Sequence, residues 1–190
     1  MEMKYGEAES RQFVTNLGLV TSSGKWGHDI MTAEWTHHIS YSPAMVAVNV
    51  HDYDATADNI IESGEFGVSL ASESQTELVD IAGHSSGKKT DKVAALEELG
   101  FRFYKAARIG AYMVEGAVLN LECRLVKYEK VGDHVMFIGE VLEARADESE
   151  GPAVFRSGTG IYKVGDKIGH DKGPEREKKV GDALSRHAKP

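Results

Sequence analysis

The chain has little of what marks secreted, membrane-bound or nucleic-acid-binding proteins. One cysteine, Cys123, in 190 residues allows no internal disulfide, which fits a reducing compartment. No apolar run approaches the length that a bilayer requires, and the polar, acidic start MEMKYGEAESRQ differs from a secretory signal. The net charge of −8, from 22 basic and 30 acidic residues, opposes the balance of non-specific nucleic-acid binders. We therefore expect a cytoplasmic protein that binds neither nucleic acid nor membrane.

Further absences narrow the chemistry. No G-x-G-x-x-G follows the first expected strand, so a Rossmann nucleotide site is not supported. The chain has neither a cysteine cluster nor an H-E-x-x-H motif. Adjacent strand residues point to opposite faces, so His37 and His38 cannot both bind one ion from a regular strand. We therefore expect no metal site, and we interpret Cys123, in an alternating segment, as an inert core thiol.

The apolar residues that are present gather in short segments that favour β-structure. Strands are predicted over residues 13–23, 45–50, 66–70, 118–128, 134–145 and 160–164. Polar, glycine-bearing stretches predict a loop over 24–29 and a hairpin turn over 131–133.

Three short helices are predicted between these strands. Thr56 is expected to cap the first helix. The three ranges, each with the glycine expected to end it, are 57–63 with Gly64, 76–82 with Gly83 and 91–99 with Gly100. Many antiparallel strands with a few short helices indicate a barrel rather than a doubly wound sheet. We expect one domain over 1–165 and a charged tail over 166–190, either weakly ordered or docked on a partner subunit.

The segment 29–43 is the most informative part of the chain. It contains Met31-Thr32-Ala33, Trp35, Ser40 and Pro43, matching a strand N-x-M-T-A-x-W that is followed by a serine and a proline. Residues 87–92 resemble the G-x-x-x-D-K part of an S-G-x-x-x-D-K stretch, and residues 121–124, 132–134 and 139–141 resemble a final hairpin. In this order, over residues 10–164, the motifs resemble the flavin reductase-like, FMN-binding split-barrel family. Position 29 is aspartate where that family often has asparagine.

The resemblance implies both a fold and a cofactor. The fold is mainly β: an antiparallel FMN-binding split β-barrel with Greek-key topology and a few short inserted helices. The cofactor is FMN, with NADH or NADPH as the possible electron donor. The resemblance also implies a homodimer with the flavin near the interface. Independent support comes from aromatic residues in segments that a lone barrel would expose, although they could instead fill the barrel mouth of a monomer: Trp26, Trp35, Phe101, Phe103 and Tyr104.

The chemistry of FMN suggests which residues would bind it. Its dianionic phosphate requires hydroxyl and N–H donors beside a cation. Candidates for this contact are Ser40, Thr56, Lys88 and Lys89, with Asn49 and His51 for the phosphate or the ribityl chain. The rings require an extended backbone with small side chains, and the candidates are Met31, Thr32, Ala33, Glu34 and Trp35. The resemblance places His134 beside the flavin, as a catalytic residue that would position the nicotinamide or assist proton movement.

Each candidate also has a purely structural interpretation. Ser40 and Thr56 alone are typical of a turn and a helix cap, and Trp35 is typical of a packed aromatic residue. The two lysines are typical of a solvated loop, and His134 of an exposed hairpin. Their common order in the chain favours the functional interpretation.

Three functions remain open. An enzyme would reduce bound FMN with NAD(P)H and pass the electrons to a free flavin, a ferric complex or a quinone. A flavoredoxin-like carrier would receive electrons from a protein partner, and a flavin-binding barrel would not turn over. The presence of His134 favours the enzyme, and the lack of an adenosine pocket favours FMN over FAD.

Overall fold

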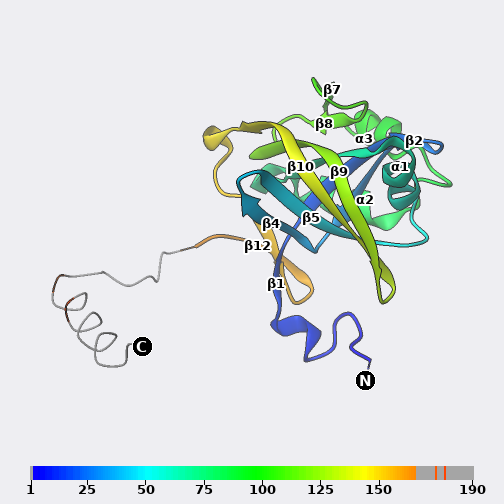
Figure 1. Cartoon of the computed structure of the whole chain (residues 1–190). Helices are drawn as coiled ribbons and strands as arrows, with labels where there is room; N and C mark the ends of the chain where they lie inside the picture. Colours follow the sequence, from blue (N-terminus) through cyan, green and yellow to red (C-terminus); the bar gives the residue numbers. More distant parts are fainter. Residues whose placement is uncertain (1, 166–173, 175–177, 179–190) are drawn as a thin grey trace, which may run out of the picture.

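The computed structural model describes residues 2–165, 174 and 178 (Figure 1). The tail expected over 166–190 lies outside the described residues, apart from these two positions. Among the described residues, no helix is long and apolar enough to cross a membrane.

A seven-stranded antiparallel sheet dominates the fold, in the order β3-β2-β6-β9-β10-β5-β4. Its edge strands, β3 and β4, are consecutive in the chain and are separated only by residues 34–35, so the sheet curls until its two edges approach each other. β6, β9 and β10 are neighbours in the sheet, and β5, which precedes β6 in the chain, pairs with β10 at the far side of this group. This arrangement is a Greek key. The predicted mainly β split barrel is thus confirmed. In chain order the strands are Gly18–Gly24 (β2), Gly27–Ala33 (β3), Thr36–Tyr41 (β4), Ala44–His51 (β5), Glu65–Leu70 (β6), Leu119–Val131 (β9) and His134–Ala146 (β10).

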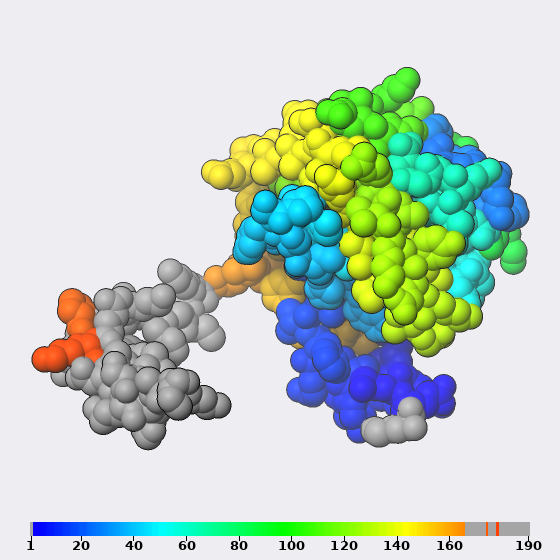
Figure 2. All heavy atoms as spheres, in the orientation of Figure 1, coloured from blue at the N-terminus to red at the C-terminus, as the bar shows by residue number. Residues whose placement is uncertain are grey.

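Smaller sheets and turns complete the described chain. A three-stranded sheet joins β1 (Val14–Asn16), β11 (Val154–Ser157) and β12 (Gly160–Lys163), and a two-stranded sheet joins β7 (Phe103–Lys105) and β8 (Tyr112–Val114). Short 3₁₀ turns cover Ser10–Gln12, Glu73–Gln75 and Glu148–Glu150. In the space-filling view, the N-terminal segment before β1 stands out from the barrel body (Figure 2).

The core has two main clusters because β2 is buried on both faces. Val20 belongs to the barrel interior with Phe66 and Phe137, whereas its neighbour Leu19 belongs to a cluster with Leu78 and other residues outside the barrel. Successive strand residues point to opposite faces, so one strand can serve both clusters. Cys123 lies in the barrel cluster and is fully buried, as expected for a core thiol.

Three helices pack beside β2 and β3: α1 (Ala55–Ser63), α2 (Thr76–His84) and α3 (Lys92–Glu98). Gly64 ends α1 with the predicted left-handed conformation, at a φ of 71°. The predicted cap was wrong, because Asp54 is the N-cap residue and Thr56 lies inside the first turn. The predicted end of α2 was also wrong, since Gly83 lies within the helix.

Two predicted strand boundaries were wrong as well. The segment 13–23 is divided at Leu17 into β1 and β2, which belong to different sheets. The predicted loop over 24–29 is a tight turn, because β2 extends to Gly24 and β3 begins at Gly27. The positive φ of 76° at Gly27 allows this turn, and glycine adopts that conformation without steric strain.

Candidate functional site

Two cavities meet along the edge strand β3. The larger has a volume of about 740 Å³ and the smaller about 370 Å³. Met31, Thr32 and His51 line both of them. Because β3 pairs only with β2 among the described strands, its outer edge is open where the barrel is split. The cavities therefore follow from the incomplete closure of the sheet.

Most of the sequence-predicted site residues line these cavities. The larger is lined by Met31, Thr32, Ala33, Glu34, Trp35, Asn49, His51 and His134, and the smaller by Met31, Thr32, His51 and Thr56. The structure thus brings together residues from β3, β5, β10 and α1. Ser40, Lys88 and Lys89 line neither cavity.

The link between β3 and β4 is held in place by backbone and side-chain hydrogen bonds. The backbone N–H of Asn49 donates to the carbonyl oxygen of Trp35 at 3.1 Å, and the Asn49 amide group donates to the same oxygen at 3.3 Å. The Thr36 hydroxyl donates to the carbonyl oxygen of Ala33 at 3.0 Å. On β3 itself, the Thr32 hydroxyl donates to the Val79 carbonyl oxygen of α2 at 2.5 Å. The wall of the larger cavity is therefore tied to two neighbouring elements.

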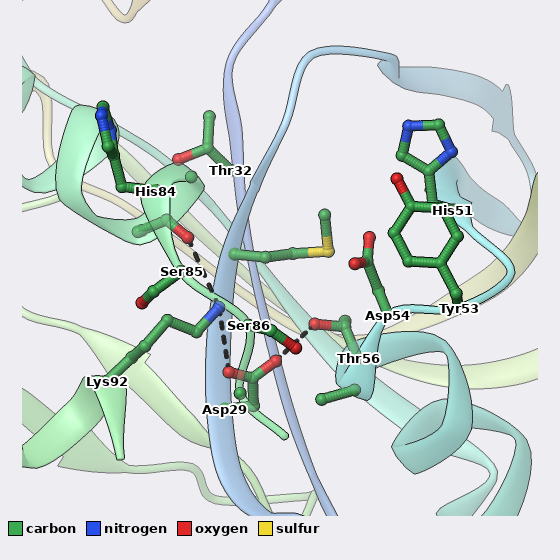
Figure 3. Close-up of a pocket in the computed structure, with 15 residues that line it drawn as sticks. Asp29, Thr32, His51, Tyr53, Asp54, Thr56, His84, Ser85, Ser86 and Lys92 are labelled. Atoms are coloured by element: carbon green, nitrogen blue, oxygen red, sulfur yellow. Dashed lines mark hydrogen bonds and ion pairs between the residues drawn. The ribbon is translucent and has the colours of Figure 1, made fainter. Parts of the chain in front are cut away.

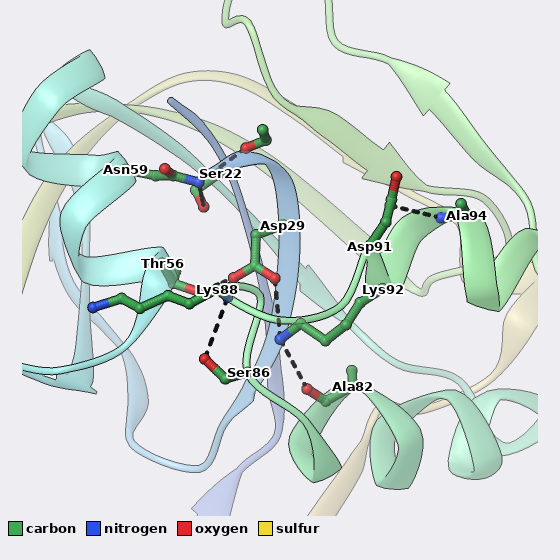
Figure 4. Close-up of polar contacts among 11 residues, drawn as sticks. Ser22, Asp29, Thr56, Asn59, Ala82, Ser86, Lys88, Asp91, Lys92 and Ala94 are labelled. Atoms are coloured by element: carbon green, nitrogen blue, oxygen red, sulfur yellow. Dashed lines mark hydrogen bonds and ion pairs between the residues drawn. The ribbon is translucent and has the colours of Figure 1, made fainter. Parts of the chain in front are cut away.

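A buried ion pair forms the polar floor of the smaller cavity (Figures 3 and 4). The Lys92 Nζ lies 3.1 Å from the Asp29 Oδ1, and the two residues are only 4% and 2% exposed. The Thr56 hydroxyl donates to the other Asp29 oxygen at 2.6 Å, and Lys92 donates to the Ala82 carbonyl oxygen at 3.4 Å. A cation buried this deeply is rare without such partners.

Sequence reasoning missed Lys92 as a site residue. The stretch 87–92 ends in the D-K pair, in which Asp91 is the α3 N-cap and accepts from the Ala94 backbone N–H at 3.0 Å. Lys92 follows in the first turn of α3 and projects towards Asp29 (Figure 4). Asp29 and Lys92 both lie in motifs that the sequence shows, and their order was the one signal available. No local pattern indicates that the two side chains contact each other.

The two lysines that the sequence predicts as site residues, Lys88 and Lys89, lie on the loop before α3. The Lys88 Nζ forms an ion pair with Asp58 at 3.0 Å and lies 5.4 Å from the centre of the Trp26 ring. Lys89 is exposed. Ser40 lies on β4 beside a β-bulge, opposite Met45 of β5. Their roles in cofactor binding stay predictions.

Four aromatic rings form a row along the shared rim of the cavities. The ring centres are 4.6 Å apart between Trp35 and His134, 3.8 Å between His134 and His51, and 4.8 Å between His51 and Tyr53. The His134 Nδ1 is 2.7 Å from an Asp133 carboxylate oxygen, and this hydrogen bond lowers the pKa of Asp133. The row is therefore flanked by an ionised carboxylate.

Several further residues of the cavities were not predicted from sequence. Asp54 lines the smaller cavity, and burial raises its pKa. Arg156 of β11 lines the larger cavity and pairs with Glu34 at 3.1 Å. The loop residues Ser85 and Ser86 supply hydroxyl groups to the smaller cavity. They come from segments that are distant in sequence, so only the fold shows that they meet.

Comparison with known proteins identifies the family of this chain. The sequence profile described as "Flavin reductase like domain" matches residues 10–161. The chain therefore belongs to the flavin reductase-like family, as the resemblance had indicated.

Individual relatives extend over different shares of the chain. An uncharacterized protein of Archaeoglobus fulgidus is 33% identical over 120 residues, which are 63% of this chain and 66% of that protein, just under two thirds of its length. An NADH-dependent flavin reductase of Rhodococcus sp. is 27% identical over 163 residues, 84% of this chain and 85% of that protein. The crystal structure of flavoredoxin from Methanosarcina acetivorans superimposes with a TM-score of 0.76 at 22% identity, covering 94% of this chain and 99% of that one. The last comparison shows the fold alone.

Proposed function

We propose that the protein is an NAD(P)H-dependent oxidoreductase that binds FMN and passes electrons to a flavin, a ferric complex or a quinone. The observation that carries this proposal is the pair of connected cavities along β3: one has a buried ammonium group, and the other has an aromatic wall. The similarity to an NADH-dependent flavin reductase supports it.

The residues of the smaller cavity fit a phosphate group. Lys92 offers a positive charge, and Thr56, Ser85 and Ser86 offer hydroxyl groups, as an anion site requires. The floor is not purely cationic, because Asp29 offsets the charge of Lys92. An orientation with the phosphate here directs the flavin rings towards the larger cavity, where Ala33 and Trp35 lie.

The chain's own residues then control access and orientation. A bound flavin would supply the redox chemistry, with the nicotinamide as the hydride donor. His134 lies between Trp35 and His51, and Asp133 fixes the orientation of its ring. We assign to His134 the positioning of the nicotinamide or the movement of a proton at the edge of the flavin.

The primary test identifies the cofactor and the electron donor. Heat-released cofactor is separated by chromatography, and the oxidation of NADH and of NADPH is followed in the presence of excess flavin. We expect FMN as the main species and turnover with at least one donor. FAD as the main species would contradict the choice of cofactor. Bound FMN without turnover would instead favour the flavoredoxin-like carrier.

The position of the phosphate is tested by fluorescence titration of the apoprotein with FMN. Asp29→Asn removes the charge that opposes Lys92, so it should tighten binding. The double variant with Asp29→Asn and Lys92→Met should weaken binding by about tenfold or more, because a charge-assisted contact contributes about 1.5–3 kcal/mol. The variant with Lys88→Ala and Lys89→Ala is the comparison. If only this last variant loses affinity, the phosphate lies on the outer loop.

We also propose that the protein is a homodimer. The residues that support this proposal differ from those expected from the sequence. Phe101 and Phe103 are partly buried against a core cluster, so they give no argument for an interface. Three exposed aromatic residues are better candidates: Trp35 at 46% and Tyr53 at 64%, which line the cavities, and Tyr41 on β4 at 90% exposure. Light scattering should give about twice the chain mass of 20.7 kDa. A monomer mass with FMN fully bound would contradict the dimer.

A further inference from the structure

Two histidines that are far apart in sequence face each other across a strand pair. His51 ends β5 and His134 begins β10, and the two residues are direct partners in the antiparallel register. Cross-strand partners place their side chains on the same face of the sheet. Their ring centres are 3.8 Å apart, with an angle of 32° between the ring planes. Nothing in the spacing of the sequence brings these two residues together.

Asp133 holds both rings by their Nδ1 atoms. The carboxylate of Asp133 lies 2.7 Å from the His134 Nδ1, and its backbone carbonyl oxygen lies 3.3 Å from the His51 Nδ1. Both oxygens can only accept, so each Nδ1 is the donor, which leaves the Nε2 of a neutral ring as the nitrogen that can bind a metal ion. Within the described part of the chain, neither Nε2 has a hydrogen-bond partner.

We propose that His51 and His134, both oriented by Asp133, form a binding site for a divalent transition-metal ion of the zinc type. One potential ligand atom from each of the three side chains lies within 4.8 Å of the other two, so the rings and the carboxylate are gathered at one place. A histidine that binds a metal through one nitrogen almost always donates its other N–H to a carboxylate or a backbone carbonyl, and Asp133 provides one of each. Imidazole nitrogen favours zinc, copper, nickel and cobalt, whereas magnesium and calcium prefer oxygen ligands.

The position of this site gives it a regulatory consequence. His51 lines both cavities, and His134 is the residue to which we assign the nicotinamide. A metal ion held by both rings would occupy that position and inhibit turnover. Metal binding itself does not depend on the flavin, whereas the inhibition rests on the proposed function.

The metal site is tested on untagged apoprotein by calorimetric titration with ZnCl₂ and by the visible absorption of added CoCl₂. We expect one ion per chain. His51→Ala and His134→Ala should abolish binding, and Asp133→Ala, which removes the carboxylate that orients His134, should weaken it about 10- to 100-fold. His51→Gln repeats the test with a side chain of similar size, in case the alanine variant does not fold. His38→Ala is the control, because that ring packs against Tyr41 on β4.

The outcomes separate this inference from the proposed function. Absence of zinc binding, or binding that is unchanged in both histidine variants, would overturn the metal site, whatever FMN does. Zinc binding without any FMN binding would support the metal site and refute the proposed function. If both bind, ZnCl₂ should inhibit NADH oxidation by the wild type, while the His38→Ala control should be inhibited equally. Full activity with zinc bound would refute the inhibitory role.

Discussion

The buried pair of Asp29 and Lys92 allows a quantitative test of what holds the smaller cavity together. Replacing Lys92 with methionine keeps most of the side-chain volume. Among the described residues it leaves the Asp29 carboxylate, 2% exposed, with the Thr56 hydroxyl at 2.6 Å as its one remaining partner. Removing one partner of a buried ion pair destabilises a protein by about 3–5 kcal/mol. For a domain of this size each kcal/mol lowers the Tm by about 2–4 °C, so we expect a loss of roughly 6–20 °C.

A double-mutant cycle shows whether that loss comes from the charge. Urea unfolding of the apoprotein is measured for wild type, Lys92→Met, Asp29→Asn and the double variant. We expect the double variant to lose less stability than the sum of the two single losses, by about 1–3 kcal/mol, because it buries no unpaired charge. Lys88→Met is the matched control; its pair with Asp58 is partly exposed, so the loss should stay below about 1 kcal/mol. Losses that add within about 0.5 kcal/mol would refute the coupling.

Three further predictions concern single residues, two at the smaller cavity and one in the barrel core. Gly87→Ala would place a Cβ against the Asp29 carboxylate, so we expect about 1–3 kcal/mol of destabilisation by urea unfolding and weaker FMN binding by fluorescence. Burial raises the pKa of Asp54, so the native state holds its proton more tightly and stability falls as pH rises through the interval between the usual and the raised pKa. Asp54→Asn should therefore be more stable than wild type at about pH 7 and similar at about pH 3, and the reverse order would contradict this. Burial raises the pKa of Cys123 to about 12, so a thiol reagent at about pH 8 should label it only after unfolding, and rapid labelling of the native protein would contradict its burial.

Five of the cavity residues that could be predicted from sequence form one continuous segment. Met31 to Trp35 form the end of β3 and the link to β4, and all five line the larger cavity. A strand depends on residues that are close in sequence, and its side chains alternate between two faces. The local sequence therefore indicates an extended segment, in which the small side chain of Ala33 leaves room for a ligand. The position of His134 could also be predicted from local sequence, because Gly132 indicates the hairpin turn that precedes it.

The rest of the site depends on contacts between distant segments, which local patterns do not encode. Lys88 and Lys92 are equally basic in sequence, but the helical turn that begins at Asp91 directs Lys92 inward, while Lys88 lies beside Asp58 of α1. Threonine is a common N-cap residue, but Asp54 is the N-cap of α1, and the Thr56 hydroxyl donates to Asp29 instead. In both cases two residues have similar local propensities, and tertiary packing determines which of them takes the position.

The same strand alternation that forms the core also places the site. On β3, Ile30 belongs to the outer core cluster, and the next residue towards that side, Thr32, bonds to α2. Asp29 and Met31 point the other way, so Asp29 meets Lys92 and Met31 packs against the barrel cluster while lining both cavities. A slip of one residue in the pairing of β2 with β3 would exchange these two faces. It would bury the Asp29 charge among apolar side chains, away from Lys92, and expose Ile30 to the cavity. The stability of the core therefore specifies the register of β3, and that register holds the polar floor and the aromatic wall on one side of the split in the barrel.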